Sequence, residues 1–402
     1  MAAIIFLMPP FFLVAQNPSG MINPQQIVAK DTSGQKDLIR VFLDFTHFRV
    51  KKLPRIKGKK VYYSLLPFGT LPRGGTALVT STQAGFYLGD KKNTYLSNIT
   101  FSPSTNLKGQ YNVPLSSNIW SAGNKWNFGG DLRYSYIPQD TWGLGGHQED
   151  SNKLRINYSY VRFYANALKR IKPYLFAGIG YNLDYHINIR PENDTANIRE
   201  FTGYQFGTAN HSNSFSSGIT LNLLYDTRAN SINPLPGFFG NVIFRINPVS
   251  LGNEDGWYSL YVDTRKYIPF ARKGQNVLAI WTYLWTSFGS SSPYLNLPAI
   301  GWDSEQRSGR GIYNRRYTGT TLWYLETEYR KDITKNGLFG FVVFANLNSV
   351  TEPVTNRFVY LHPAAGAGMR IKFNKNSGTN IGIDYGFSKN YSGFYFSLGE
   401  VF

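Results

Sequence analysis

The sequence contains no cysteine. Disulfides therefore cannot hold the fold together, and a structural zinc site with thiolate ligands is excluded. Long apolar runs are also missing, because no segment beyond residue 15 reaches the roughly 18 consecutive apolar residues of a membrane-spanning helix. Acidic residues are scarce, with 24 Asp and Glu against 42 Lys and Arg, which gives a formal net charge of +18.

The positive charge is spread along the chain, and its one dense cluster lies between residues 51 and 60. A nucleic-acid-binding protein would gather such charge into a compact patch, so we expect no nucleic-acid partner. We expect the positive charge to contact the anionic headgroups of membrane lipid and lipopolysaccharide instead.

The chemistry of an enzyme is missing as well. The five histidines are dispersed and show no metal-ligand spacing: His47, His147, His186, His211 and His362. No phosphate-binding loop, dinucleotide fingerprint or GxSxG nucleophile motif occurs in a strand-to-helix context. The sequence therefore predicts no enzyme, no cofactor and no metal site.

Aromatic residues, in contrast, are abundant. They make up 16% of the chain, with 28 Tyr, 29 Phe and 8 Trp, yet the mean hydropathy is −0.29. A helical membrane protein would be far more apolar. A β-barrel with one face toward lipid and the other toward water is mildly polar on average and rich in interfacial aromatics, so this composition favours a barrel.

Apolar and polar residues alternate with period 2 in many segments, which indicates strands with two different faces. The segment 379–388 is the clearest example, with Ile381, Ile383, Tyr385 and Phe387 on one face and Asn380, Gly382, Asp384, Gly386 and Ser388 on the other. Segments near residues 132–136, 175–184, 219–226 and 339–348 repeat the pattern. Charges on the polar face would be costly in a dry core but not in a wet lumen.

About 16 such segments fit between residues 60 and 402, at a spacing typical of membrane barrels. We therefore predict an all-β fold, a transmembrane antiparallel β-barrel of the bacterial outer membrane. Residues 1–16 are interpreted as a signal peptide and residues 17–59 as a short periplasmic segment. The chain ends in SGFYFSLGEVF, where Phe394, Phe396, Leu398 and Phe402 share one phase and Glu400 interrupts it.

Several motifs, in order, resemble the bacterial surface antigen superfamily of outer-membrane barrels. It includes the barrel-assembly factor, the translocation-and-assembly module and the two-partner-secretion transporters. The resemblance covers roughly residues 60–402 and depends on Tyr225-Asp226-Thr227-Arg228 with Asn230, Pro236 and Gly237, on Ser308-Gly309-Arg310-Gly311-Ile312-Tyr313, on Glu328-Tyr329-Arg330, on Phe344-Ala345-Asn346 and on the last three strands.

The resemblance implies a long sixth extracellular loop that folds back into the barrel, where its arginine meets inward carboxylates. Here Arg310 and Gly311 would form the loop tip, and Glu328 would be the partner of Arg310. Asn346 replaces the usual Asp, so one charge-assisted contact is lost and Glu326 becomes an alternative partner. Asp226 and Arg228 carry the family's strand motif.

The leading functional hypothesis is insertion or translocation of proteins at the outer membrane. Family barrels achieve this through a weakly paired lateral seam between the first and last strands, to which we assign Gly393, Gly399 and Phe402. The segment before Lys60 is too short for a POTRA module, which receives clients in relatives. A non-catalytic subunit or homodimer docked to another outer-membrane complex therefore stays open, as does a simple diffusion pore. The expected protein partners are nascent outer-membrane proteins or a partner membrane protein.

Overall fold

The computed structural model describes residues 35–41, 55–56, 59–66, 69–70, 76–106, 109–228, 230–270, 276–289 and 291–402. The predicted signal peptide, residues 1–16, lies outside the described residues. Most of the predicted segment 17–59 lies outside them too. Among the described residues, no helix is long and apolar enough to cross a membrane.

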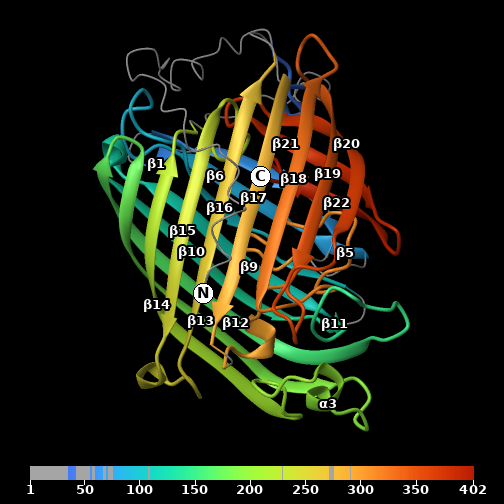
Figure 1. The fold of residues 1–402 in the computed structure, drawn as a ribbon. Helices are drawn as coiled ribbons and strands as arrows, with labels where there is room; N and C mark the ends of the chain where they lie inside the picture. Colours follow the sequence, from blue (N-terminus) through green and yellow to red (C-terminus); the bar gives the residue numbers. More distant parts are fainter. Residues whose placement is uncertain are drawn as a thin grey trace.

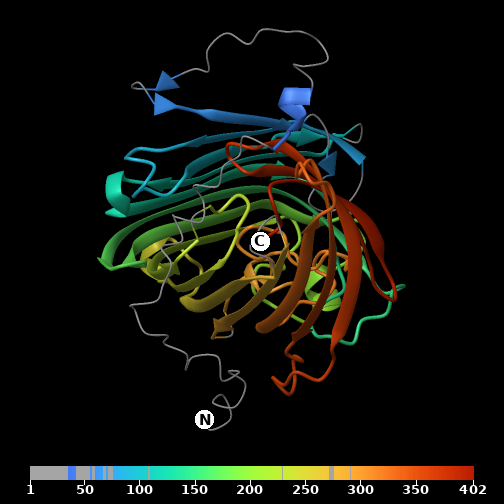
Figure 2. The ribbon, with the colours of Figure 1, turned by 90° about the horizontal axis from the view of Figure 1, so that it is seen from above.

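The strands close into one barrel (Figures 1 and 2). Four of its strands are interrupted: β3 (Tyr62–Leu66) with β4 (Gly69–Thr70), β5 (Thr76–Val79) with β6 (Ser81–Phe86), β7 (Ser97–Phe101) with β8 (Ser104–Thr105), and β10 (Trp126–Tyr136) with β11 (Gln139–Thr141). Twelve are continuous: β9 (Tyr111–Trp120), β12 (Leu154–Lys172), β13 (Leu175–Pro191), β14 (Ser212–Asp226), β15 (Gly237–Asn247), β16 (Trp257–Pro269), β17 (Asn276–Phe288), β18 (Thr321–Asp332), β19 (Phe339–Val350), β20 (His362–Asn374), β21 (Thr379–Phe387) and β22 (Ser392–Leu398).

The described part of the barrel thus contains sixteen strands, as predicted. The last strand, β22, lies next to β3, so the seam joins the first and last strands. Outside the barrel, β1 (Arg55–Ile56) and β2 (Lys59–Lys60) form a small hairpin. The described residues include short helical elements: residues 38–41, η2 (Ala122–Asn124), α3 (Ile198–Thr202), η3 (Val249–Leu251) and η4 (Tyr294–Asn296).

The two faces of the strands confirm the alternation in the sequence. On β21, Tyr385 and Phe387 are 42% and 50% exposed on the outer face, whereas Asp384 is 1% exposed on the lumen side. Neighbouring residues on a strand point to opposite sides, so one register places Ile381, Ile383, Tyr385 and Phe387 toward lipid and Asn380 and Asp384 inward.

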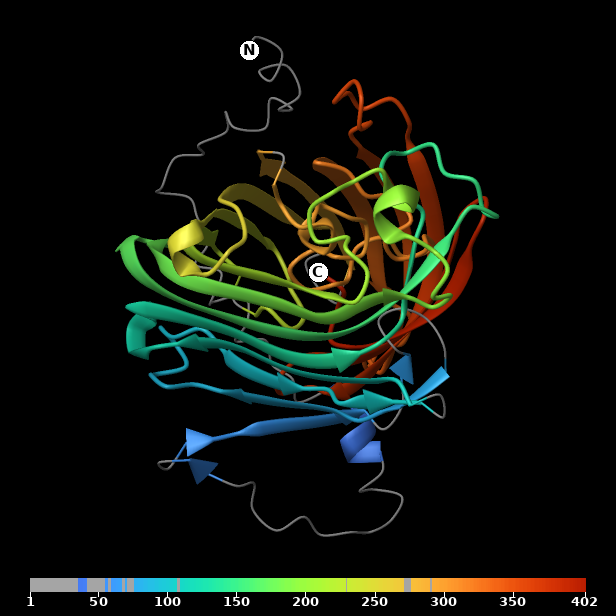
Figure 3. The ribbon, with the colours of Figure 1, turned by 90° about the horizontal axis from the view of Figure 1, so that it is seen from below.

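The end of the chain departs from the prediction. β22 ends at Leu398, and Gly399 has φ = +93°, a conformation that glycine adopts without steric cost. The following residues turn into the lumen, where the C-terminus lies inside the ring of strands (Figures 2 and 3). Phe402 is 2% exposed there, and its ring centroid lies 5.2 Å from that of Trp281. The prediction that Phe402 shares one phase with Phe394 and Phe396 is therefore wrong, because its ring packs against β17 inside the lumen.

The segment 289–320 connects β17 and β18, the eleventh and twelfth strands of the barrel. Successive antiparallel turns alternate between the two ends of the barrel, so this is the sixth connection at its end, the position that the resemblance assigns to the sixth extracellular loop. It fills the lumen instead of projecting from the rim (Figure 3). We refer to residues 289–320 as loop six.

Candidate functional site in the barrel lumen

Loop six has a defined fold of its own. The Asp303 carboxylate accepts backbone N–H bonds from Glu305, Arg307 and Ser308 at 3.2, 3.0 and 2.8 Å. The buried Arg315 donates to the carbonyl oxygens of Leu295 and Tyr294, at 3.0 Å each. These bonds satisfy backbone groups that a loop buried in the lumen would otherwise leave unpaired.

The tip of loop six carries Arg310, which is only 2% exposed. Its guanidinium contacts three carboxylates: Nη2 binds both Glu326 and Glu328 of β18, and Nη1 lies 2.6 Å from Oδ2 of Asp384 on β21. The guanidinium carbon also lies 3.7 Å from the centroid of the Phe344 ring. A planar guanidinium is suited to this site because its donors point in several fixed directions at once.

Gly311 brings the loop tip against the backbone of β21. It has φ = +87°, and a Cβ at this position would lie 2.6 Å from the backbone nitrogen of Phe387. The Gly311 N–H donates to the hydroxyl oxygen of Tyr395, on β22, at 2.8 Å. Loop six therefore touches the last strand as well as the strand beside it.

Asn346 supports the loop through its amide group. Its Nδ2 donates to the backbone oxygen of Arg310 at 2.8 Å. The structure thus brings Arg310, Gly311, Glu328 and Asn346 together. Sequence reasoning missed Asp384 as a third carboxylate for Arg310. The alternation on β21 already placed Asp384 on the lumen side. The family motifs, however, direct attention to Glu328 on β18 and Asn346 on β19.

A second group of ion pairs continues from this cluster to the end of the chain. Arg370 pairs with Asp384 at 2.5 Å and with Glu400 at 2.8 Å, and Arg330 pairs with Glu328 at 2.5 Å. Glu400 interrupts the apolar alternation at the end of the sequence, and the structure places its carboxylate in the lumen. Its burial opposes ionisation, but Arg370 and Arg330 outweigh this effect and lower the pKa of Glu400.

Loop six also binds the chain end directly. Arg307 donates from Nη1 to the backbone oxygens of Glu400 and Val401, at 2.9 and 3.2 Å. Its neighbour Glu305 faces Arg265 at 3.3 Å. The Glu305 side chain is 42% exposed. The surrounding lumen atoms oppose its ionisation, but Arg265 and Arg307 outweigh this effect and lower the pKa of Glu305 to about 2.

Asp226 and Arg228 form a separate pair at the end of β14. Nε and Nη2 of Arg228 lie 3.0 and 2.9 Å from the two carboxylate oxygens of Asp226, a bidentate arrangement. The turn that follows reaches the β20–β21 turn, because Asn230 donates to the oxygen of Ser377 at 2.7 Å and Asn233 to that of Gly378 at 2.9 Å. The motif thus orders a turn at the end of the barrel opposite loop six.

Of the residues assigned to the seam, Gly393 lies on β22, while Gly399 lies just after its end. The Cβ of a larger residue at Gly399 would lie 3.0 Å from the backbone oxygen of Ile232. Gly399 therefore turns the tail inward next to the turn after β14. Within the described ranges, no three His, Cys, Asp or Glu side chains are grouped so that they could hold a metal ion.

Comparison with known proteins agrees with this architecture. The model of the Omp85 superfamily domain matches residues 92–402. The structure of BamA from Haemophilus ducreyi lacking POTRA domains 1–3 is similar with a TM-score of 0.51 at 14% identity, covering 85% of this chain and 68% of that one. CdiB from Acinetobacter baumannii gives a TM-score of 0.48 at 10% identity, covering 85% of this chain and 65% of that one. The comparison with curated proteins finds no match. The domain match confirms the resemblance that the motifs predicted: this chain belongs to the Omp85 superfamily of outer-membrane β-barrels.

Proposed function

We propose that this barrel assists the insertion or translocation of proteins at the outer membrane, through the seam between β22 and β3. The observation that carries the proposal is the position of Arg310 among the carboxylates of Glu326, Glu328 and Asp384. These contacts fix loop six to β18 and β21, and Gly311 extends the connection to β22 at the seam. Movement of the seam and movement of loop six are then coupled.

The strands at the seam are short. As described, β22 has 7 residues and β3 has 5 before its interruption, whereas β12 to β20 have between 11 and 19. Fewer ladder bonds make a pair of strands easier to separate, and a separated strand edge can pair with an incoming strand. Short seam strands therefore favour a barrel whose wall opens sideways to a client.

The filled lumen argues against a wide diffusion pore. Large aromatic side chains from the wall and the tail form one buried cluster there, including Tyr267, Trp281, Tyr283, Tyr324 and Phe402. Loop six packs on the same cluster through Ile300 and Ile312. An aqueous pore requires an open polar constriction, so we propose that the resting barrel conducts poorly.

Site-specific photo-crosslinking in cells tests the proposal. A photoreactive residue at Ser392, on β22, and one at Ser64, on β3, should crosslink to many newly made outer-membrane proteins. The matched control is a probe at Phe163, which is 45% exposed on the outer face of β12, away from the seam. We expect few client crosslinks there.

Three outcomes would count against an insertase. A single stoichiometric partner at both seam positions would identify a docked subunit, and crosslinking to a second copy would identify a homodimer. Equal client crosslinking at Phe163 and at the seam would mean that clients meet the barrel wall at random. Lipid and lipopolysaccharide are expected as partners of the outer face at all three positions.

A further inference from the structure

Exposed lysines lie on the outer face of the barrel at the end opposite loop six. Lys169, Lys266 and Lys331 lie close to the ends of β12, β16 and β18. Each is exposed and directly follows a buried lumen residue, so each points outward: the buried residues are Leu168, Arg265 and Arg330. A lysine on the lipid-facing side of a barrel strand is costly at the bilayer midplane but not near the interface. These lysines therefore mark the depth of the lipid headgroups.

Each of the three lysines lies opposite an aromatic residue of the neighbouring strand. The register pairs Lys169 with Trp126, Lys266 with Phe238, and Lys331 with Phe341. The Nζ atoms of Lys169 and Lys266 both lie 6.0 Å from the centroid of the opposing ring. Directly opposite residues are the closest side-chain neighbours across two strands, and an aromatic face attracts a cation at this distance. The rings therefore help to position the ammonium groups.

The ammonium groups are available to an outside partner. Across the described ranges, no ion pair joins Lys169, Lys266 or Lys331 to an Asp or Glu. Beside Lys169, the ring of Trp126 is 38% exposed and stacks on that of Phe128 with the centroids 6.0 Å apart. Tryptophan rings of this kind gather at the boundary between lipid and water. The partner expected at this boundary is an anion.

A β-bulge adds a fourth lysine beside Lys169. The pairing of β12 with β13 shifts between Arg170 and Lys172, so that Lys172 lies opposite Leu175. Leu175 shares the outward phase of β13 with Ile179, which is 63% exposed. Regular alternation would have placed Lys172 on the lumen side, because one residue of shift moves a side chain to the other face. The bulge thus brings Lys172 to the same outer face as Lys169.

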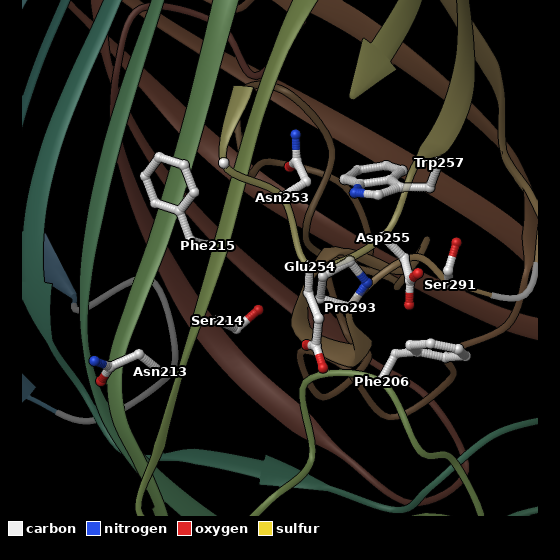
Figure 4. A pocket seen from close by; sticks show the side chains of 11 residues that line it. Phe206, Asn213, Ser214, Phe215, Asn253, Glu254, Asp255, Trp257, Ser291 and Pro293 are labelled. Atoms are coloured by element: carbon white, nitrogen blue, oxygen red, sulfur yellow. The ribbon is translucent and has the colours of Figure 1, made fainter. Parts of the chain in front are cut away.

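The loop-six end of the barrel differs in its outward pairs and in its charge. On β16, Tyr258 lies near that end and stacks on Phe244 of β15, with the ring centroids 6.1 Å apart. The turn between these strands carries the exposed Glu254 and Asp255 beside a pocket (Figure 4). The opposite end of β16 carries Lys266. An anionic surface is therefore attracted to one end of this strand and repelled from the other.

We propose that Lys169, Lys172, Lys266 and Lys331 bind the phosphate groups of anionic phospholipids in the leaflet at this end of the barrel. Since the family resemblance makes loop six extracellular, this is the periplasmic leaflet. The lysine stems lie along the apolar wall while the ammonium groups reach the headgroups. An acidic protein would approach the turns beyond the strands, whereas these side chains face lipid. The proposal does not depend on insertion or translocation of proteins.

Spin-labelled lipids test the proposal on the full chain reconstituted in phosphatidylcholine vesicles. Electron paramagnetic resonance distinguishes lipid at the protein surface from bulk lipid, and so compares labelled phosphatidylglycerol with labelled phosphatidylcholine. We expect phosphatidylglycerol to associate about twofold to fivefold more strongly, since one lysine near an anionic lipid contributes up to about fivefold. High salt should reduce this preference by screening. A chain with Lys169→Gln and Lys266→Gln should lose about half of it, because two of the four lysines are removed.

Lys92→Gln with Lys335→Gln is the matched control. Both lysines are exposed in turns at the same end, between β6 and β7 and between β18 and β19, and their removal should leave the preference unchanged. The heat-modifiable mobility of each variant on electrophoresis verifies its folding.

Four results would overturn the proposal. The first is equal association of the two lipids with the unmodified chain. The second is an unchanged preference in the folded variant without Lys169 and Lys266, which would leave these lysines to an acidic protein partner. The third is an equal loss in the control, which would show an effect of net charge alone. The fourth is complete suppression of the preference by millimolar glycerol phosphate, which would identify a site for a free phosphate instead of a lipid.

Discussion

Arg310 at the tip of loop six donates from Nη1 to Oδ2 of Asp384 on β21 at 2.6 Å, across 74 positions of the sequence. The same guanidinium binds Glu326 and Glu328 on β18. One side chain therefore holds a loop against two strands that are not neighbours in the barrel. Among the described residues, Glu328 and Asp384 have second arginine partners in Arg330 and Arg370, whereas Glu326 is paired with Arg310 alone.

Arg310→Ala should lower the stability of the folded barrel by about 3–5 kcal/mol, because it leaves the buried Glu326 carboxylate without an arginine partner and next to the negative charge of Glu328. Arg310→Lys should have an intermediate effect, since an ammonium group keeps the charge but lacks the planar fork. The temperature at which the compact electrophoretic form unfolds measures both. Arg199→Ala, in the exposed part of α3, is the control and should change nothing. An unchanged unfolding temperature for Arg310→Ala would show that the cluster does not stabilise the barrel.

Gly311→Ala should loosen loop six by a steric mechanism that leaves all charges in place. The new Cβ would lie 2.6 Å from the Phe387 nitrogen, and the residue has φ = +87°. Gly203→Ala is a matched control, since Gly203 has φ = +62° but nothing within 4 Å of the added Cβ. We expect Gly311→Ala to cost about 1–3 kcal/mol more than Gly203→Ala, the usual range for overpacking. Equal unfolding temperatures would mean that the loop tip does not press against β21.

Asn346→Asp introduces the residue that the family pattern has at this position, yet it should destabilise this chain. Asn346 donates from Nδ2 to the Arg310 backbone oxygen at 2.8 Å, and an aspartate would place a carboxylate against that carbonyl. Asp384 already supplies the third carboxylate for Arg310. We expect a loss of about 1–3 kcal/mol, the cost of an unsatisfied buried acceptor. Urea unfolding in detergent measures it, and a gain in stability would show that Arg310 recruits the new carboxylate.

The sequence predicted the barrel well because side-chain direction follows from the strand backbone alone. A period of 2 placed Asp384 inward and Tyr385 outward before any contact was known. The loop-six residues were predictable from the motif order. The third carboxylate was not, because which inward residue meets Arg310 depends on how loop six folds within the closed ring. Glu400 and Phe402 were misplaced because the alternation was continued past Gly399, whose backbone turns the chain inward.

Phe402→Ala tests whether the inward tail is part of the stable fold. The Phe402 ring lies 5.2 Å from Trp281 and 6.5 Å from Tyr267, centroid to centroid, and Arg330 donates to the Phe402 backbone oxygen at 2.8 Å. Truncation of a buried phenylalanine costs about 3–5 kcal/mol. Because Arg307 of loop six binds the same tail through Glu400 and Val401, the variant should also make loop six more accessible to protease from outside the cell.

The control for this experiment is Phe358→Ala, a truncation of a ring that is 45% exposed in the loop between β19 and β20. It should change stability by less than about 0.5 kcal/mol, as surface substitutions usually do. If Phe402→Ala behaved like Phe358→Ala in both unfolding temperature and protease sensitivity, the tail would be a passive chain end. A loss of stability without greater protease sensitivity would instead separate the packing of the tail from the position of loop six.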